Sequence, residues 1–490
     1  MEFEVLKQSH LKRNIIIGVV AVLIISVIVL NITRAKYRTT QSIPLVNGTI
    51  NYELSDLNLI GVYIKNSNEY TQTDEIPNNG YLFNEEKSYC KIGNVVNDDI
   101  TINYDIKTKK LTISPMTSKG TKCYLYFDAP TNIEELLATK TIAIREDFTQ
   151  TLESDTTGMI YETEDNEGTT YYYAGAPTDN WVKFGKWSED TPDMYFLNSA
   201  HEEFYTLEEC QEISDSCRLI SRAGKDMYWR IIRINGNGSL RLIYAGTTPV
   251  HLNDDSFIGV SAFTNQDDDN AYVGYMYGTP GSSTYEETHA NINDSTIKAF
   301  IDEWYEKNML PYNSKIDTET GFCADRRIST RETNPQAGIG QTINHYYTAD
   351  IRDYFLDDPS LKCANTNDYF TVSTSSIGNK ALTYPVALIN TMEAIYAGYN
   401  TRDENFEDHF ITNPNMYLYP KYAYKTMTPG SFYDTIQSAV WHINSKTNGE
   451  GYISTSTVDM LLTVRPVLNL KPDITFVSGD GTAEHPFEIG

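Results

Sequence analysis

The longest run of apolar residues in this chain lies near its start, at residues 15–32. As an α-helix, this segment is about long enough to cross the hydrocarbon core of a bilayer, which takes roughly 20 residues at ~1.5 Å each. A cleavable signal peptide would end in small residues, but Arg34 and Lys36 flank the nearest alanine. We therefore predict a cytoplasmic stub and a retained single-pass transmembrane helix in residues 1–38. A cleaved signal peptide and a soluble core helix are the alternatives.

Residues 39–130 contain short runs of β-branched and aromatic residues that are typical of strands. The runs occupy residues 49–54, 57–64, 99–106, 110–116 and 122–128. Turn residues such as Pro77 to Gly80 separate them. This pattern predicts a small β-sandwich domain that is closed by a disulfide between Cys90 and Cys123.

Residues 131–168 are rich in Thr, Glu and Asp and offer few apolar side chains for burial. A segment of this composition cannot offset the entropy lost when it becomes ordered. Apart from a short helix at residues 132–138, we expect a solvated linker.

Residues 169–490 alternate strand patterns with a few helical ones. The clearest signal is a β-hairpin, in which residues 227–234 and 239–246 flank an Asn-Gly-Asn-Gly turn. Further strands are expected at residues 438–444, 463–470 and 474–479. Helices are expected at residues 297–305, where apolar side chains recur at helical spacing, and at 349–355 and 391–397. Many short strands with few helices predict a larger α+β domain.

The charge balance excludes one class of partner. The chain has 39 basic and 66 acidic residues and a formal net charge of −27. Proteins that bind nucleic acid neutralise its phosphates with clustered Lys and Arg, so we do not expect nucleic acid as a partner. Three basic residues lie on each side of residues 15–32, and this tie leaves the orientation of the predicted span undecided.

The six cysteines indicate on which side of the membrane the bulk of the chain lies. They occur as neighbouring pairs: Cys90 and Cys123, Cys210 and Cys217, and Cys323 and Cys363. No C-x-x-C spacing occurs, and no histidine lies at zinc-ligand spacing from them, so a metal site is a poor alternative. Six cysteines allow many connectivities, of which we predict the nearest-neighbour one. Because disulfides persist outside the reducing cytosol, we expect the bulk of the chain to be extracellular.

Motifs that would carry catalysis are scarce. Ser295 begins an S-x-x-K sequence that lacks the partner motifs of that family of nucleophiles, and it stands where the predicted helix needs a cap. Asp302, Glu303 and Glu306 are expected on the solvent side of that helix. We therefore predict no catalytic residues.

No cofactor is expected, and calcium is the alternative at one acidic region. Asp254, Asp255 and the segment Asp267-Asp268-Asp269-Asn270 offer the oxygen ligands that Ca²⁺ prefers. They lack the D-x-D-x-D-G spacing that wraps the ion.

Tyrosine is abundant, with 36 residues. Its ring combines an apolar body with a polar tip, which suits recognition surfaces. Tyr417, Tyr419, Tyr422 and Tyr424 form the densest stretch and are a possible contact surface; ordinary sheet packing is the alternative.

Six segments carry a resemblance to a known group. They are GTKCYLYFD (120–128), TYYYAGAPTDNWVKFG (170–185), YWRIIRINGNGSLRLIYAG (228–246), LTYPVALINTMEAIYAG (382–398), TVRPVLNL (463–470) and GDGTAEHPFEI (479–489). Together they resemble N-terminally membrane-anchored surface proteins of low-GC Gram-positive gut bacteria. The resemblance covers nearly the whole chain after the anchor and implies a location, with no established activity. The C-terminal domain resembles the C-type-lectin-like fold that formylglycine-generating enzymes also use.

Two departures limit what this resemblance implies. Sugar-binding C-type lectins hold calcium with Glu-Pro-Asn or Gln-Pro-Asp and Trp-Asn-Asp motifs, whereas the nearest strings here are Asn413-Pro414-Asn415 and Trp441-His442-Ile443. Formylglycine-generating enzymes use paired cysteines close to the C-terminus, whereas the last cysteine here is Cys363. Neither site is expected in this chain.

The sequence therefore predicts a membrane-anchored extracellular binding or adhesion protein. A β-sandwich stalk would carry a lectin-like head that contacts a glycan or a protein. The alternative is a cell-envelope hydrolase whose carboxylates converge only in the folded C-terminal domain.

Overall fold

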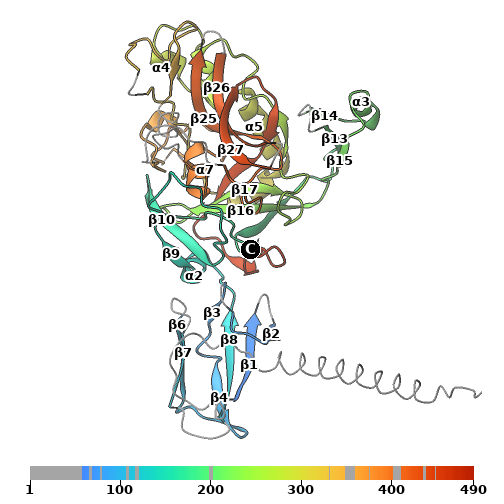
Figure 1. The fold of residues 1–490 in the computed structure, drawn as a ribbon, viewed down its shortest axis with the longest axis vertical. Coiled ribbons are helices and arrows are strands. Elements are labelled where there is room, and N and C mark those ends of the chain that lie inside the picture. The colour runs from blue at the N-terminus through green and yellow to red at the C-terminus, as the bar shows by residue number, and fades with distance from the viewer. Residues whose placement is uncertain are drawn as a thin grey trace, which may run out of the picture. The chain divides into compact units, whose positions relative to one another are not determined.

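The computed structural model describes most of the chain after residue 57 (Figure 1). The described residues are 58–65, 69–77, 80–105, 110–115, 121–197, 202–329, 332–347, 359–374, 376–400, 410–433, 437–446 and 449–490. They form two compact units. Unit 1 contains the described parts of Met1–Ile64, Tyr70–Pro77 and Phe83–Phe127, and unit 2 contains those of Lys65–Glu69, Asn78–Leu82 and Asp128–Gly490. Strands predominate, and a few helices make the chain α+β, as expected.

Three predicted elements lie outside the described residues: the membrane span at 15–32, the strand at 49–54 and the helix at 349–355. Within the described ranges, no helix combines the length and the apolar character that crossing a membrane requires. The prediction of a transmembrane anchor thus rests on the sequence of residues 15–32.

Unit 1 contains one larger β-sheet and a separate hairpin. The strands of the sheet follow the order β2-β1-β8-β4-β5, and β6 pairs with β7 to form the hairpin. The strands are β1 (Asn58–Lys65), β2 (Tyr70–Thr73), β3 (Leu82–Phe83), β4 (Tyr89–Ile92), β5 (Val95–Val96), β6 (Thr101–Asp105), β7 (Lys110–Ser114) and β8 (Thr121–Asp128). The ring of Tyr104 on β6 packs against Phe83 and Phe127, so the hairpin contacts one face of the sheet.

Strand β8 shows how the sheet of unit 1 is built. Its odd-numbered residues from Thr121 to Phe127 are buried and the others are not, because successive side chains of a strand point to opposite faces. Cys90 on β4 lies directly opposite Cys123 on β8, and the two form a disulfide. The prediction that this disulfide closes a sandwich is therefore wrong, since it joins two neighbouring strands of one sheet.

A ten-stranded mixed sheet runs through unit 2. The order of its main strands is β24-β29-β17-β16-β11-β10-β9. In addition, β12 pairs with β16 and with β31, and β31 pairs with β30. The strands are β9 (Thr141–Ala143), β10 (Met159–Asp165), β11 (Gly168–Tyr172), β12 (Trp181–Lys186), β16 (Asp226–Ile234), β17 (Leu240–Gly246), β24 (Val386–Leu388), β29 (Pro466–Leu470), β30 (Phe476–Ser478) and β31 (Phe487–Ile489). The predicted hairpin is the antiparallel pair β16 and β17, at the centre of this sheet.

A second sheet of six strands completes the core of unit 2. Its order is β18-β28-β25-β26-β27, and β22 pairs with β25. The strands are β18 (Gly259–Ser261), β22 (His345–Tyr346), β25 (Tyr424–Tyr433), β26 (Gln437–Ser445), β27 (Gly451–Thr457) and β28 (Leu462–Val464). Two short pairs join β19 (Met276–Tyr277) to β20 (Asn293–Asp294) and β21 (Phe322–Cys323) to β23 (Tyr369–Phe370). A disulfide links Cys323 on β21 to Cys363.

Side-chain caps start the α-helices of unit 2. The helices are α2 (Ile133–Ala138), α3 (Leu207–Gln211), α4 (Tyr285–Thr288), α5 (Thr296–Asn308) and α7 (Thr391–Ala397), with 3₁₀ helices η1 (Asn270–Val273), η2 (Leu310–Lys315) and η3 (Thr366–Asp368). Ser295 caps α5 by accepting a hydrogen bond from the amide of Lys298, the role expected from the sequence. Asp302 departs from its predicted position on the solvent side: it is half-buried and pairs with the Lys298 ammonium at 2.6 Å.

Residues 131–168 belong to unit 2 and do not form the predicted linker. Strands β9 and β10 extend the ten-stranded sheet, and β10 pairs along its length with β11. Ile160 is buried, and Asp165 is buried because Arg233 compensates its charge. The mean composition of the segment was misleading, because pairing at the edge of a sheet needs apolar residues at only a few positions of one face.

A buried network of charges joins four elements of unit 2. Glu393 on α7 accepts hydrogen bonds from Arg233 on β16 (3.2 Å) and from Arg241 on β17, and Arg233 also pairs with Asp165 on β10 (2.6 Å). All four side chains are at most 5% exposed. Burial alone would raise the pKa of Glu393, but Arg241 and Arg233 outweigh burial and lower this pKa below its usual value. The Glu393 carboxylate is therefore charged at neutral pH and compensates both guanidinium groups.

We predict that Glu393→Gln lowers the free energy of unfolding by about 3–5 kcal/mol, because it leaves two buried guanidinium groups without their shared counter-charge. Urea denaturation followed by tryptophan fluorescence measures the loss. Glu164→Gln is the control, since Glu164 pairs with Lys362 at the surface and its replacement should leave the unfolding midpoint unchanged. A loss below about 1 kcal/mol for Glu393→Gln would contradict the importance given to this network.

Candidate functional site

The four tyrosines predicted as a contact surface are buried in unit 2. Tyr417, Tyr419, Tyr422 and Tyr424 are 1%, 8%, 6% and 0% exposed, respectively. Their hydroxyl groups reach acceptors inside the protein, as the Tyr417 hydroxyl does by donating to the carbonyl oxygen of Tyr173 at 3.2 Å. A ring whose polar tip is paired is buried without leaving an unsatisfied group. The predicted contact surface is therefore wrong, and these rings pack internally.

Three of the acidic residues considered for calcium, Asp254, Asp255 and Asp269, are engaged in contacts within the protein. Asp254 pairs with two basic side chains, and Asp255 accepts hydrogen bonds from Thr247. Asp269 is buried, and its two oxygens accept hydrogen bonds from two backbone amides. In the part of the chain that the structure describes, no group of three His, Cys, Asp or Glu side chains could hold a metal ion. The geometry gives no support to a calcium site here.

Unit 2 carries a projecting arm, which Figure 1 shows extending away from its two large sheets. The arm comprises β13 (Met194–Leu197), β14 (Glu202–Phe204), α3 and β15 (Arg218–Ile220), with the strand order β14-β13-β15. The disulfide Cys210–Cys217 closes the short loop between α3 and β15. Such a cross-link restricts the conformations of the loop, so the arm presents a defined surface.

The inner face of the arm attaches it to the rest of unit 2. Phe196 and Ile220 are buried in a small cluster with Phe257 and Tyr422, and the rings of Phe196 and Phe257 lie 4.8 Å apart. Arg222 follows β15, stacks on Phe257 and donates a hydrogen bond to its carbonyl oxygen at 2.6 Å. These contacts leave the outer face of the arm available.

The outer face of the arm is apolar. Phe204, Tyr195 and Leu219 lie side by side across the three strands, since Tyr195 is in register with both of the others. Four large apolar side chains of the arm are strongly exposed: Tyr205 (75%), Leu207 (40%), Ile213 (56%) and Leu219 (56%). Single exposed apolar residues are ordinary, but a concentration of them marks an interaction site. The arm is therefore the strongest candidate contact surface of unit 2.

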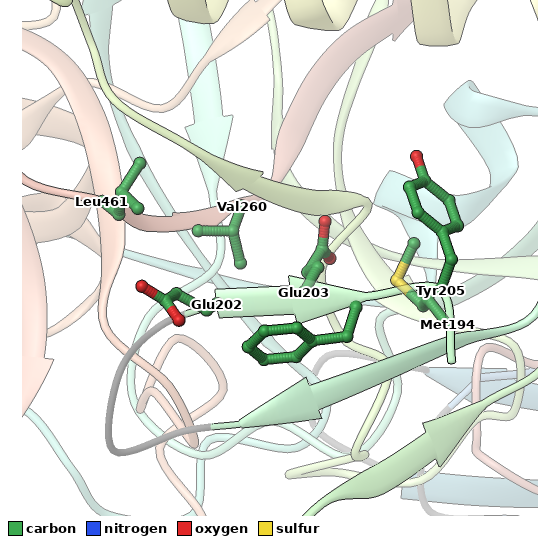
Figure 2. A pocket seen from close by; sticks show the side chains of 7 residues that line it. Met194, Glu202, Glu203, Tyr205, Val260 and Leu461 are labelled. Atoms are coloured by element: carbon green, nitrogen blue, oxygen red, sulfur yellow. The ribbon is translucent and has the colours of Figure 1, made fainter. Parts of the chain in front are cut away.

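A pocket of about 290 Å³ adjoins the arm at β14 and β18 (Figure 2). Its lining residues are Met194, Glu202, Glu203, Phe204, Tyr205, Val260 and Leu461. Figure 2 shows the side chains of Glu202 and Glu203 extending in different directions from β14, as consecutive residues of a strand do. The pocket, called the arm pocket below, thus combines apolar walls with carboxyl groups.

Burial at the arm pocket changes the pKa of Glu203. Its Oε1 atom is buried and forms no hydrogen bond within the part of the chain that the structure describes. Burial raises the pKa of Glu203 to about 7, although the charge of Arg222 and a hydrogen bond from the Val260 amide act against burial. Near neutral pH, a large fraction of Glu203 is therefore a neutral carboxylic acid, which can donate a hydrogen bond to a ligand.

Unit 1 has an aromatic surface of a different kind. Tyr63, Tyr89, Tyr124 and Tyr126 are half-buried, and their rings stack on one another, with centroids 4.9 Å apart for Tyr63 and Tyr126 and 5.0 Å apart for Tyr89 and Tyr124. Such cross-strand ring pairs stabilise a sheet. Because the rings cover one another's faces, this tyrosine row presents mainly ring edges and hydroxyl groups. It is poorly suited to stacking on a sugar ring.

One signal in the sequence points to the arm. The disulfide between Cys210 and Cys217 encloses only a short loop. A disulfide of this kind restricts the conformation of that loop and does not connect distant parts of the core. Apolar residues at Leu207, Ile213 and Leu219 surround it in an otherwise polar segment. The arm pocket had no such signal, because Val260 and Leu461 reach it from distant parts of the chain.

Comparisons with protein-family models, with curated proteins and with solved structures find no match to this chain. The candidate sites therefore rest on the geometry and chemistry of the described residues.

We predict that Glu203→Gln stabilises the protein above neutral pH. The folded pKa of about 7 lies above the ordinary value of 4.5, so ionisation of Glu203 destabilises the fold as the pH rises from 4.5 through 7. Removing this ionisation should raise the free energy of unfolding by up to about 3 kcal/mol near pH 8, with no gain near pH 4. Denaturation curves across this pH range measure the effect.

Glu202→Gln is the matched control, because it removes a carboxyl group from the same strand without altering the buried one. If Glu203→Gln shifts stability equally at all pH values, or if Glu202→Gln reproduces its pH profile, the assignment of the raised pKa to Glu203 fails.

Proposed function

We propose that this protein is a membrane-anchored extracellular binding or adhesion protein, and that its arm contacts a protein partner. The concentration of exposed apolar side chains on a disulfide-bonded arm carries the proposal. Protein interfaces bury aromatic and aliphatic side chains at their centres, and a projecting surface reaches a partner without rearrangement of the core. A rigid loop also loses little entropy on binding.

The disulfides support the extracellular location. Each of the six cysteines is paired, which fits an environment outside the reducing cytosol. Residues 15–32 supply the proposed single-pass anchor, with the short N-terminal stub in the cytoplasm and the two units outside the cell.

The proposed architecture is a β-sandwich stalk formed by unit 1 and a C-type-lectin-like head formed by unit 2. Two features support it: the hairpin of unit 1 packs on its sheet, and unit 2 is a compact α+β body with a buried β-hairpin at its centre. The resemblance to membrane-anchored surface proteins of gut bacteria fits the same arrangement.

A protein is favoured over a glycan as the partner for two reasons. The tyrosine row of unit 1 has few free ring faces, and the tyrosines from Tyr417 to Tyr424 are buried. The arm offers aliphatic side chains, such as Leu219 and Ile213, which pack against apolar protein surfaces.

A second candidate function is a cell-envelope hydrolase, and one observation favours it. Glu202 and Glu203 line one pocket, and a carboxyl group with a raised pKa beside a second carboxyl group is a pattern of glycoside hydrolysis. The two side chains diverge from neighbouring positions of β14, which is unfavourable for joint action on one bond. We therefore place binding first.

The binding proposal predicts saturable binding of the full-length protein, held in lipid nanodiscs, to at least one protein of an extracellular protein array. Leu219→Asp should weaken this binding about tenfold or more, because it places a charge at the exposed β15 end of the apolar row. Ile142→Asp is the control: Ile142 is also exposed but lies on β9, away from the arm.

Three outcomes would count against this assignment. A protein without any saturable partner would contradict the function, and equal losses for Leu219→Asp and Ile142→Asp would contradict the role of the arm. Binding to a glycan array alone would replace the proposed partner class.

The extracellular location predicts that no thiol of the cell-expressed protein reacts with an alkylating reagent before reduction, and that all six react afterwards. Intact-mass measurement distinguishes the two states. Six reactive thiols in the unreduced protein would contradict the location.

A further inference from the structure

A small cavity lies beside the segment Tyr417–Tyr422 of unit 2, and basic side chains surround it. Its volume is about 20 Å³, and it is lined by Arg230, Arg465, His251, Lys421, Trp181 and Tyr417, among others. Two of its lining residues, Val250 and Lys421, are partly or largely exposed, which places them at its outer rim. This basic cavity is separate from the arm pocket, with which it shares no lining residue.

The two arginines are held in place by neutral groups. Arg230 donates hydrogen bonds to the side-chain oxygen of Asn180 (2.5 Å) and to the carbonyl oxygen of Pro177 (2.7 Å), and its guanidinium group stacks on Trp181 at 4.4 Å. Arg465 donates to the carbonyl oxygen of Tyr244 (3.0 Å) and stacks on a tyrosine ring. Both side chains are more than nine-tenths buried.

Neither guanidinium group has a carboxylate partner among the described residues. Arg233, Arg241 and Arg326, which are buried to a similar degree, each form an ion pair with a buried carboxylate. Asp179 contributes a favourable charge at Arg230, but Lys140 already pairs with it at 2.6 Å. A buried charge without a partner is costly, and here two of them adjoin one cavity.

The titration of the neighbouring groups reflects this excess positive charge. Burial, together with repulsion from Arg465, lowers the pKa of Arg230 to about 9. Burial and the two guanidinium groups lower the pKa of His251 to about 4, so its ring is neutral and its Nε2 donates to the carbonyl oxygen of Pro414 at 2.6 Å. The rim residue Lys421 pairs with Asp254 at 2.6 Å.

We propose that the basic cavity binds a small anion, supplied either as free chloride or as the carboxylate group of a larger extracellular ligand. Its size admits about one water-sized group, which excludes a whole sugar or phosphate ester but admits a chloride ion, or one oxygen of a carboxylate whose other atoms stay at the rim. Charge-assisted hydrogen bonds from a guanidinium group are the strong ones available to a carboxylate. In a chain with a net charge of −27, such a cavity concentrates positive charge at one point.

The test uses the full-length protein in non-ionic detergent, at constant ionic strength with sodium methanesulfonate as the background salt. Chloride is titrated while the line width of its ³⁵Cl resonance is recorded, and sodium acetate is then added as a competitor. The site should broaden the chloride line, and acetate should reverse the broadening. If acetate raises the melting temperature saturably without chloride broadening, the site takes carboxylate alone.

Variants connect the signal to the cavity. Arg465→Met and Arg230→Met should abolish the anion response, and Lys421→Gln, which leaves the buried groups in place, should weaken the apparent affinity by roughly threefold or more. Lys362→Gln is the control, because Lys362 also pairs with a surface carboxylate but lies on another part of unit 2. Two results would overturn the proposal. The first is that the protein binds neither chloride nor acetate. The second is that Lys421→Gln and Lys362→Gln have the same anion affinity and that Arg465→Met still binds the anion.

Discussion

The buried carboxylate of Glu393 is the interaction on which the arrangement of unit 2 depends. It binds Arg233 and Arg241 on the two central strands of the ten-stranded sheet, and Arg233 extends the network to Asp165 near the edge of that sheet. One short helix, α7, is thereby fixed to β16, β17 and β10. Strand β16 also carries Arg230 of the basic cavity, so the network helps to set the strand on which that cavity is built.

Buried charged groups of unit 2 that have an opposite partner stabilise the fold, whereas buried groups without one are candidates for binding a ligand. Arg326 and Asp368 illustrate the first kind, since both are buried and bind one another at 2.7 Å. Pairs of this kind compensate internally and need no ligand. Among the buried groups that form no ion pair in the described part of the chain, Arg230 and Arg465 line the basic cavity, and Glu203, whose pKa burial raises to about 7, lines the arm pocket. The arm adds an apolar surface, so polar recognition and apolar contact are carried by different parts of unit 2.

Local patterns in the sequence predicted the local structure well. The hairpin of β16 and β17, the helices α5 and α7, and the nearest-neighbour disulfides follow from turn residues, apolar spacing and proximity along the chain. Features that depend on distant contacts were missed. The composition of β9 and β10 resembles that of a linker, and these strands join the large sheet only through β11, which pairs with the distant strand β16. The burial of Tyr417 is not visible in the sequence, because the acceptor for its hydroxyl group, the carbonyl oxygen of Tyr173, is far away along the chain.

The candidate sites were the least predictable part, for the same physical reason. The arm pocket forms only where β14 meets β18 and Leu461, and the sequence does not show that the Oε1 atom of Glu203 is buried there. The basic cavity likewise arises from strands that meet only in the folded sheet. Composition describes the chain as acidic overall, whereas the fold brings two buried guanidinium groups without a carboxylate partner among the described residues to one cavity.

Site-specific photocrosslinking on intact cells tests the central claim most directly. A photoreactive amino acid is placed at position 219 on the arm or at position 142 on β9, and cells that carry the full-length protein are irradiated and analysed for crosslinked products. The account predicts a discrete crosslink to one extracellular protein from position 219 and none from position 142. Equal crosslinking from both positions, or a crosslink from 219 to cytoplasmic proteins, would contradict it.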